Sequence, residues 1–363
     1  MIKVLAEYFP FTLIFISLNF FIIFLWNRKI WLKINTIYNE KHKIHAGQIP
    51  RLGGFFLYLT FLFIFLFYKN LDNTFTDFFI SIFSSIFIYL LPLILVSLYE
   101  DLYGNVNPLV RIIFIMFSCI LIMSLNLDLP IIDIPVIRNY FNNHDYLYYI
   151  FYIFCLMIVA NGKNMIDGLN GLLILSSISM FLCLYKLSII VGHSDLIYFS
   201  IIMIYFLSII LIFNYPIAKI FMGDTGAYFL GIICGISVIY FFGSNPEVLT
   251  WNAIVILFYP SFEVLFTILR RIFNNQNITS PDLDHNHNLL FRYIKKTKIK
   301  HPNSICTLFI FPQMLIPYFF IDYVFNDLVK VFILLSIQIF IYLSFHFIIK
   351  FLIKGRISLK QSI

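Results

Sequence analysis

Charged side chains are scarce in this sequence: only 12% of its 363 residues are Asp, Glu, Lys or Arg. Soluble globular proteins carry about 25% charged residues, so the deficit excludes an ordinary soluble domain. Most of the chain consists of apolar runs of roughly 20 residues, the length that crosses the hydrocarbon core as a helix. With 61% hydrophobic residues, the sequence predicts an all-α polytopic membrane protein.

Cysteine pairs are lacking as well. The five cysteines lie at least 28 residues apart and all fall inside apolar runs, a spacing that fits neither a disulfide framework nor a zinc site. They are expected to be small buried side chains.

A cleavable signal peptide is not expected either. The first apolar run, 8–26, is too long for a signal core, and no small-residue cleavage site follows it.

The apolar runs predict about 10–11 transmembrane helices in a single domain, 1–363. The expected spans are 8–26, 53–68, 78–98, 109–127, 146–160, 169–190, 196–213, 225–242, 251–269, 305–321 and 329–349. With eleven crossings, the loops on one side hold 20 of the 25 Lys and Arg residues. Short loops rich in these residues stay cytoplasmic, so the N-terminus is predicted to be periplasmic. The net charge of +7 therefore reflects orientation, and nucleic-acid binding is not expected.

Every unusual polar segment falls in a predicted cytoplasmic loop. The segments are IPRLGG at 49–54, YEDLYGNVNPLVR at 99–111, NGKNMIDGLNG at 161–171, FMGDTGAY at 221–228 and SPDLDHNHNLLFRYIKK at 280–296. In the second of them, Glu100 and Asp101 are adjacent acids, which repel each other unless a cation or a shared proton relieves the repulsion. The pair suits a divalent metal or a general base, although a polar helix end gives the same pattern.

The segment NGKNMIDGLNG carries polar side chains at steps of three. They are Asn161, Asn164, Asp167 and Asn170. This spacing predicts that they lie along one face of a helix. Their oxygens are suitable ligands for magnesium, and their amide N–H groups can bind phosphate or sugar oxygens. A helix-capping loop is the alternative interpretation.

Asp224 lies just before the expected span 225–242. It has two interpretations, an N-cap of that helix or a carboxylate that binds a metal.

The last polar segment contains two histidines, His285 and His287. Zinc binding is not favoured, because no cysteine accompanies them and a spacing of two residues does not suit helical zinc ligands. With Arg292 downstream, a phosphate-binding loop is expected, and a solvated basic loop is the alternative.

One acid, Glu263, lies within the expected span 251–269. An ionisable residue at membrane depth is a functional candidate by default. A catalytic role and an internal contact, with a neighbouring helix or with Arg270, are both open.

In matching order, from about 45 to 295, the polar segments resemble the polyprenyl-phosphate N-acetylhexosamine-1-phosphate transferases, glycosyltransferase family 4 of bacterial surface-polysaccharide synthesis. The family includes undecaprenyl-phosphate N-acetylglucosamine-1-phosphate transferase and phospho-N-acetylmuramoyl-pentapeptide transferase. The similar elements are Pro-Arg-x-Gly-Gly, an acidic pair followed by a basic residue, Asn-x-x-Asn-x-x-Asp-Gly-x-Asp/Asn-Gly-Leu and Gly-Asp-x-Gly. The sequence departs from the usual pattern at Glu100 and Asn170, where Asp is common, and at Arg111, which lies about one residue further along.

The resemblance implies a magnesium-dependent reaction, with manganese as a second candidate metal. Undecaprenyl phosphate would attack the β-phosphate of a UDP-N-acetylhexosamine, and UMP would leave. The implied metal ligands are Asn164 and Asp224. The implied catalytic residues are Glu100, Asp101 and Asp167, with Asp101 deprotonating or positioning the lipid phosphate. The implied substrate-binding residues are Arg51, Arg111, Asn161, Asn170, His285, His287 and Arg292.

The implied location is the bacterial cytoplasmic (inner) membrane, with the active site on its cytoplasmic face. The product would initiate O-antigen or other cell-surface polysaccharide synthesis. A transporter or flippase of a lipid-linked sugar is the alternative, but its polar residues should lie near the bilayer midplane. A scaffold that has lost activity is a third reading. The sequence does not identify the sugar, and a homodimer is expected by analogy alone.

Overall fold

The structure, a computed structural model, describes residues 8–27, 49–67, 74–104, 106–132, 145–277, 284–297 and 299–361. Within these ranges every regular element is a helix. The helices are α2 (Phe9–Asn27), α3 (Gly53–Phe67), α4 (Asp77–Tyr89), α5 (Leu91–Tyr103), α6 (Pro108–Met123), α8 (Asp145–Ile166), α9 (Leu172–Val191), α10 (Ser194–Asn214), α11 (Gly223–Ser244), α12 (Asn252–Ile256), α13 (Phe258–Phe273), α14 (Asn286–Lys295), α15 (Pro302–Val324) and α16 (Leu328–Gln361). The predicted all-α class is therefore confirmed.

The helices follow the expected spans. In the described part of the chain, six helices are long and apolar enough to cross a membrane, namely α8 to α11, α15 and α16. The bent pair of α4 and α5 makes a seventh, and α2, α3 and α6 are apolar but shorter. The chain is thus a multi-pass membrane protein, while the count of 10–11 spans stays a prediction.

Two expected spans are divided into helix pairs. α4 and α5 meet at Leu90 with a bend of 42°, and Pro92 lies in the first turn of α5. α12 and α13 meet at Leu257, and Pro260 lies in the first turn of α13. Because proline has no N–H group to donate, it is well tolerated in the first turn of a helix. Each break therefore lies where a proline is accommodated.

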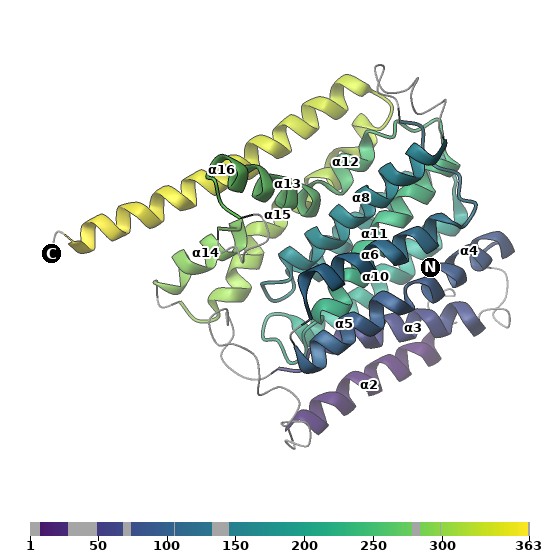
Figure 1. The fold of residues 1–363 in the computed structure, drawn as a ribbon, viewed down its shortest axis with the longest axis horizontal. Coiled ribbons are helices and arrows are strands. Elements are labelled where there is room, and N and C mark those ends of the chain that lie inside the picture. The colour runs from purple at the N-terminus through teal and green to yellow at the C-terminus, as the bar shows by residue number, and fades with distance from the viewer. Residues whose placement is uncertain are drawn as a thin grey trace.

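α11 lies at the centre of the bundle (Figure 1), and all of its residues over 223–242 are buried. Small residues let its neighbours approach closely, as is usual between membrane helices. A Cβ on Gly54 of α3 would lie 2.0 Å from the Cα of Gly226, and one on Gly231 would lie 2.5 Å from the Cα of Ala160 in α8. The beginning of α11 is therefore held against α3, and its middle against α8.

The C-terminal helices form a second packed group. In Figure 1, α2 and α3 lie along one edge of the bundle and α16 along the opposite edge. The apolar core of α13 to α16 includes Leu290 and Tyr342, together with Ile166 and Leu169. Since Ile166 and Leu169 flank Asp167, this group packs directly against the segment 161–171.

Candidate active site

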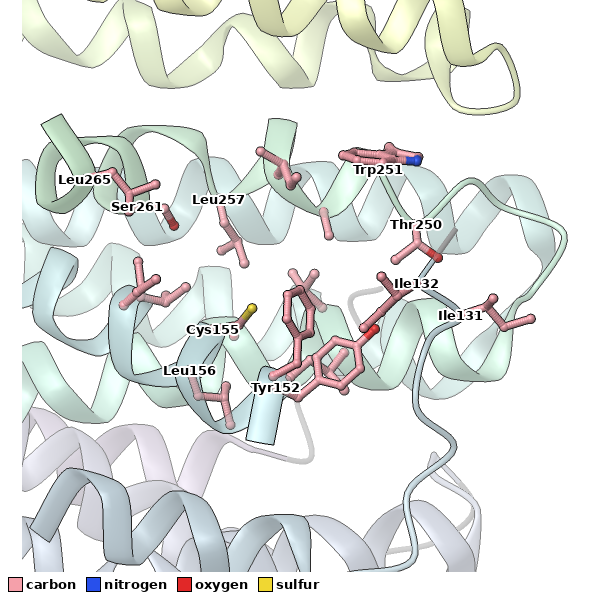
Figure 2. Close-up of a pocket in the computed structure, with 18 residues that line it drawn as sticks. Ile131, Ile132, Tyr152, Cys155, Leu156, Thr250, Trp251, Leu257, Ser261 and Leu265 are labelled. Atoms are coloured by element: carbon pink, nitrogen blue, oxygen red, sulfur yellow. The ribbon is translucent and has the colours of Figure 1, made fainter. Parts of the chain in front are cut away.

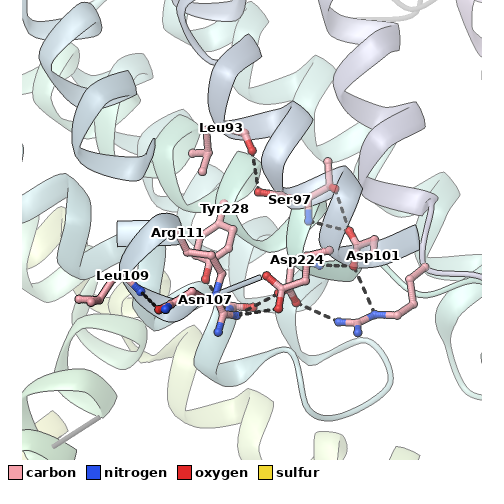
Figure 3. Close-up of polar contacts among 12 residues, drawn as sticks. Leu93, Ser97, Asp101, Asn107, Leu109, Arg111, Asp224 and Tyr228 are labelled. Carbon is pink, nitrogen blue, oxygen red and sulfur yellow. Dashed lines mark hydrogen bonds and ion pairs between the residues drawn. The ribbon is translucent and has the colours of Figure 1, made fainter. Parts of the chain in front are cut away.

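Side chains from four elements meet at the start of α11. Asp224, the second residue of that helix, accepts a hydrogen bond from Arg51 Nη2 at 2.9 Å. Its other carboxylate oxygen lies 3.3 Å from Arg111 Nη1, which is also 3.2 Å from Glu100 Oε1 (Figure 3). Arg51 precedes α3, Glu100 ends α5 and Arg111 begins α6. We call Arg51, Glu100, Asp101, Arg111 and Asp224 the arginine cluster.

Asp101 caps α11 from a neighbouring helix. The first N–H groups of a helix have no partner within it, and α11 has no side-chain cap of its own. Asp101 Oδ1 accepts from the Asp224 N–H at 2.9 Å, and Oδ2 accepts from the N–H and the hydroxyl of Thr225 at 2.9 and 2.8 Å. Both oxygens are occupied, and the side chain is fully buried. These contacts support a role for Asp101 in positioning Asp224.

Gly223 makes room for this cap. Its φ is +72°, a region that L side chains rarely adopt, and a Cβ there would lie 2.4 Å from the Arg51 carbonyl and 2.5 Å from Asp101 Oδ2. The backbone at 223 therefore brings both neighbours to the start of α11.

Glu100 differs from Asp101 in its surroundings. Its Oε1 faces Arg111, whereas Oε2 is buried and has no hydrogen-bond partner among the described residues. Within the acidic pair, Glu100 is thus the carboxylate with an oxygen to spare.

Asn164 joins the cluster through a tyrosine. Its Nδ2 donates to the hydroxyl of Tyr228 at 2.8 Å, and its amide oxygen takes no part in this contact. Tyr228 lies one helical turn after Asp224 and interacts electrostatically with Arg111. The sequence reasoning missed Tyr228, although its spacing of four residues from Asp224 places both on one face of α11.

The predicted polar stripe is wrong beyond Asn164. α8 ends at Ile166, so Asp167 and Asn170 lie in the following turn instead of on the helix face. Gly168 and Gly171 are in that turn, and Gly171, with a φ of +77°, is the residue that precedes α9.

The members of this segment have different surroundings. Desolvation by burial raises the pKa of Asp167 well above its ordinary value, and the charges of Asp224 and Asp101 add to the effect, although Arg51 opposes it. Asn161 donates to the Met157 carbonyl of its own helix at 2.8 Å.

Asn170 and Lys163 contact neighbouring segments of the bundle. Asn170 Nδ2 donates to the Pro216 carbonyl at 2.9 Å. Lys163, also missed by the sequence reasoning, is buried in the bundle and donates to the hydroxyls of Ser176 and Ser177 at 2.6 and 3.0 Å. Both side chains fasten the segment to its neighbours.

The two predicted histidines lie between α13 and the segment 161–171. His285 Nδ1 is 2.9 Å from Glu263 Oε1, and the rings of His285 and His287 are parallel, with centroids 5.5 Å apart. A Cβ on Gly168 would lie 2.7 Å from His287 Nε2, so this ring packs against the residue that follows Asp167.

Arg292 binds Asp284 at 2.8 Å. Desolvation acts to raise the pKa of Asp284, but the hydrogen bond from Arg292 and the charges of Lys350 and Arg270 hold it below its ordinary value. We call Glu263, Asp284, His285, His287 and Arg292 the histidine cluster. Asp282 lies outside the described residues.

An apolar cavity of about 270 Å³ lies beside α8 (Figure 2). It is bounded by α8, α11, α12, α13 and the segment at 131–132, and its lining is almost entirely apolar. Tyr152, Cys155 and Val159 line it from α8, and Leu257 and Leu265 line it from the opposite side. Val159 precedes Asn161 by two residues, so the cavity approaches the polar segment along α8.

Residues 82–242 match the model of glycosyl transferase family 4. The chain is 26% identical over 270 residues, 73% of its length and 72% of the relative's, to a probable undecaprenyl-phosphate N-acetylglucosaminyl 1-phosphate transferase of Bacillus subtilis. It is also 26% identical to an undecaprenyl-phosphate alpha-N-acetylglucosaminyl 1-phosphate transferase of Thermotoga maritima, over 71% and 74% of the two chains.

A phospho-N-acetylmuramoyl-pentapeptide-transferase of Leuconostoc mesenteroides is 33% identical over 41% of this chain and 46% of its own. These matches confirm the resemblance to the family.

Proposed function

With the family 4 match of residues 82–242 as the premise, we propose that this chain transfers an N-acetylhexosamine-1-phosphate from a UDP-sugar to undecaprenyl phosphate. UMP is released, and the lipid-diphospho-sugar begins a cell-surface polysaccharide. The proposed setting is the bacterial cytoplasmic membrane, with the arginine cluster on the cytoplasmic side, where UDP-sugars are available.

The observation that carries the proposal is the arginine cluster itself. Arg51 and Asp224 are 173 positions apart in the sequence, yet they form an ion pair at the N-terminus of α11. The two guanidinium groups of the cluster favour phosphate oxygens. Phosphoryl transfer depends mainly on positioning and on neutralisation of charge, which such a site supplies.

The residues present also fit magnesium. No group of three His, Cys, Asp or Glu side chains at metal-binding separation occurs among the described residues. Magnesium is commonly held by only one or two carboxylates, together with substrate phosphates and water. The carboxylate of Asp224 and the amide oxygen of Asn164 are hard ligands of this kind. When bound, magnesium or manganese would neutralise charge on the diphosphate.

The chemical step needs little else from the chain. A phosphate oxygen of the lipid attacks the β-phosphorus of the UDP-sugar, and the bond from that phosphorus to the bridging oxygen of UMP breaks. Arg51 and Arg111 bind phosphate oxygens, and Asp101 keeps Asp224 in place. Glu100 would accept the proton of a lipid phosphate that arrives singly protonated.

The apolar cavity suits the lipid tail. It runs along α8 towards Asn161, and almost all of its surface is apolar. We propose that the first isoprene units of undecaprenyl phosphate lie there, while the phosphate reaches the arginine cluster. Trp251 lines the cavity at the end that Ile131 also lines (Figure 2).

No described feature favours the transport alternative. The breaks at Leu90 and Leu257 divide two spans, but the arginine cluster lies at the ends of α5 and α11 and not beside either break. A transporter is expected to place such charges near the midplane.

The test uses purified full-length protein in detergent with undecaprenyl phosphate, magnesium and a panel of UDP-N-acetylhexosamines. We expect UMP release that requires both the lipid phosphate and the metal. Folded, monodisperse protein that releases no UMP with any donor would overturn the proposal. A D224N variant, purified in parallel, shows whether release comes from this site.

A further inference from the structure

A second, much smaller cavity lies between α9, α12, α13, α15 and α16. Its volume is about 10 Å³, and its surface is more polar than apolar. Five polar side chains line it, Ser176, Ser179, Tyr259, Gln313 and Gln338. A buried water molecule needs a cavity of about 10–15 Å³ and two to four polar partners. The cavity therefore has room for one molecule of that size, and all of its lining residues lie around the same point.

Three of the lining side chains end in a polar atom without a partner. The Tyr259 hydroxyl and the Oε1 atoms of Gln313 and Gln338 are buried and have no hydrogen-bond partner among the described residues. Tyr259 and Gln338 are only 4% and 3% exposed. An unpaired polar atom is costly inside a membrane protein, because no bulk water reaches it. These three atoms therefore indicate a ligand in the cavity.

The remaining polar groups around the cavity are already paired. The Ser179 hydroxyl donates to a main-chain carbonyl of α15, and the Ser176 hydroxyl donates to a carbonyl of its own helix at 3.0 Å. Gln338 Nε2 donates to the Val255 carbonyl at 3.2 Å, so Oε1 is the end of this amide that lacks a partner. The unpaired set thus consists of two acceptors, the amide oxygens, and one donor, the hydroxyl of Tyr259.

A water molecule matches this set, because it donates two hydrogen bonds and accepts others. An anion does not match it, since two of the three unpaired atoms are acceptors. A cation is disfavoured as well. The amine of Lys163 donates to the Ser176 hydroxyl at 2.6 Å, and a charged ammonium group beside the cavity would repel a second positive charge.

We propose that the cavity binds one water molecule, which donates to Oε1 of Gln313 and of Gln338 and accepts from the Tyr259 hydroxyl. The water joins α13, α15 and α16, the helices that carry these three side chains. The inference does not depend on the proposed reaction.

The water site lies directly behind the segment 161–171. Pro260, the residue after Tyr259, meets this segment, because a Cβ on Gly162 would lie 2.2 Å from the Pro260 carbonyl oxygen. Ser176 binds the same segment through Lys163. The bound water therefore fastens together helices that support the active-site segment from behind.

A density map of the full-length protein in detergent, at a resolution that shows ordered waters, tests the proposal directly. We expect a peak in the cavity at about 2.5–3.0 Å from the three unpaired atoms. An empty cavity would overturn the proposal. Contacts of about 2.0–2.4 Å would identify a metal ion and would overturn it too.

A double-mutant cycle tests whether the side chains share one molecule. Y259F removes only the hydroxyl, and Q313L removes one of the two amide oxygens. Each variant should lower the thermal midpoint in detergent by roughly 1–4 °C, because the water loses a partner. The loss in Y259F/Q313L should be clearly smaller than the sum of the two single losses, since residues of one hydrogen-bond network are not additive.

Y58F is the matched control. Tyr58 is also a fully buried tyrosine, but its hydroxyl donates to the Phe87 carbonyl at 2.8 Å, away from this cavity. The losses of Y58F and Q313L should therefore add in the double variant. Additive losses in Y259F/Q313L as well, or unchanged midpoints in both of its single variants, would contradict a shared water.

Discussion

The arginine cluster and the histidine cluster are built from the same kind of carboxylate but from different partners. In the arginine cluster, Asp224 and Glu100 face guanidinium groups, which remain charged at every pH in ordinary use. In the histidine cluster, Glu263 Oε1 faces the Nδ1 nitrogen of His285 at 2.9 Å. The first cluster is therefore expected to supply fixed charge for phosphates.

The two clusters also differ in how they are anchored. The arginine cluster is fixed by main-chain groups, because Asp101 accepts the N–H groups of Asp224 and Thr225. The histidine cluster is held by side-chain contacts between α13, α14 and the turn at 167–171. A substitution in the arginine cluster should therefore displace the backbone at the start of α11. A substitution in the histidine cluster should mainly move the imidazole rings of His285 and His287.

The largest expected effect is that of D224N. The substitution removes the charge that faces both arginines and the proposed metal, so turnover should fall by at least about 100-fold. UMP release measures the loss, and size-exclusion chromatography in detergent should show folded, monodisperse protein. Near-normal turnover would show that Asp224 is not part of the site. It would also contradict the role of the arginine cluster in binding phosphates.

The next comparison is between the two adjacent acids. D101N should destabilise the protein by about 2–3 kcal/mol, because it weakens charge-assisted hydrogen bonds to the start of α11. E100Q should leave the thermal midpoint in detergent nearly unchanged, yet lower UMP release by about 100-fold or more as a general base is lost. If E100Q unfolds the protein and D101N leaves it stable, the roles assigned here are reversed.

The sequence predicted the assembly of these clusters better than their internal contacts. The Lys and Arg bias placed all five polar segments on one side, and Arg51, Glu100, Arg111 and Asp224 do meet. The all-α class followed from the length of the apolar runs. Both signals are carried by many residues, so a local exception does not remove them.

What the sequence could not supply were contacts between distant segments. Asp101 caps a helix that begins 122 positions later, and no local pattern indicates such a partner. The polar stripe failed because the steps of three residues continue past Ile166, where α8 ends. A role of Asn170 in substrate binding stays a prediction; its Nδ2 donates to the Pro216 carbonyl.

Two glycines test whether the start of α11 must keep its position for activity. Gly223 and Gly192 share a positive φ, +72° and +77°, but a Cβ on Gly192 would meet nothing within 4 Å. Both G223A and G192A should cost about 1–2 kcal/mol in backbone strain. Only G223A should also lower UMP release, by about tenfold or more, since it displaces Asp101 and Arg51. Equal activity in the two variants would show that the start of α11 tolerates displacement.

The smallest expected effect belongs to the histidine cluster, at Asp284. Its pKa is depressed in the folded protein, so its ionised form adds stability above the unfolded value of about 3.9. That stability is lost as pH falls through the folded pKa. D284N should therefore lower the thermal midpoint slightly at pH 7, and the difference from wild type should shrink below about pH 4. A difference that persists unchanged to pH 3 would mean that Asp284 stabilises α14 by packing and not by its charge.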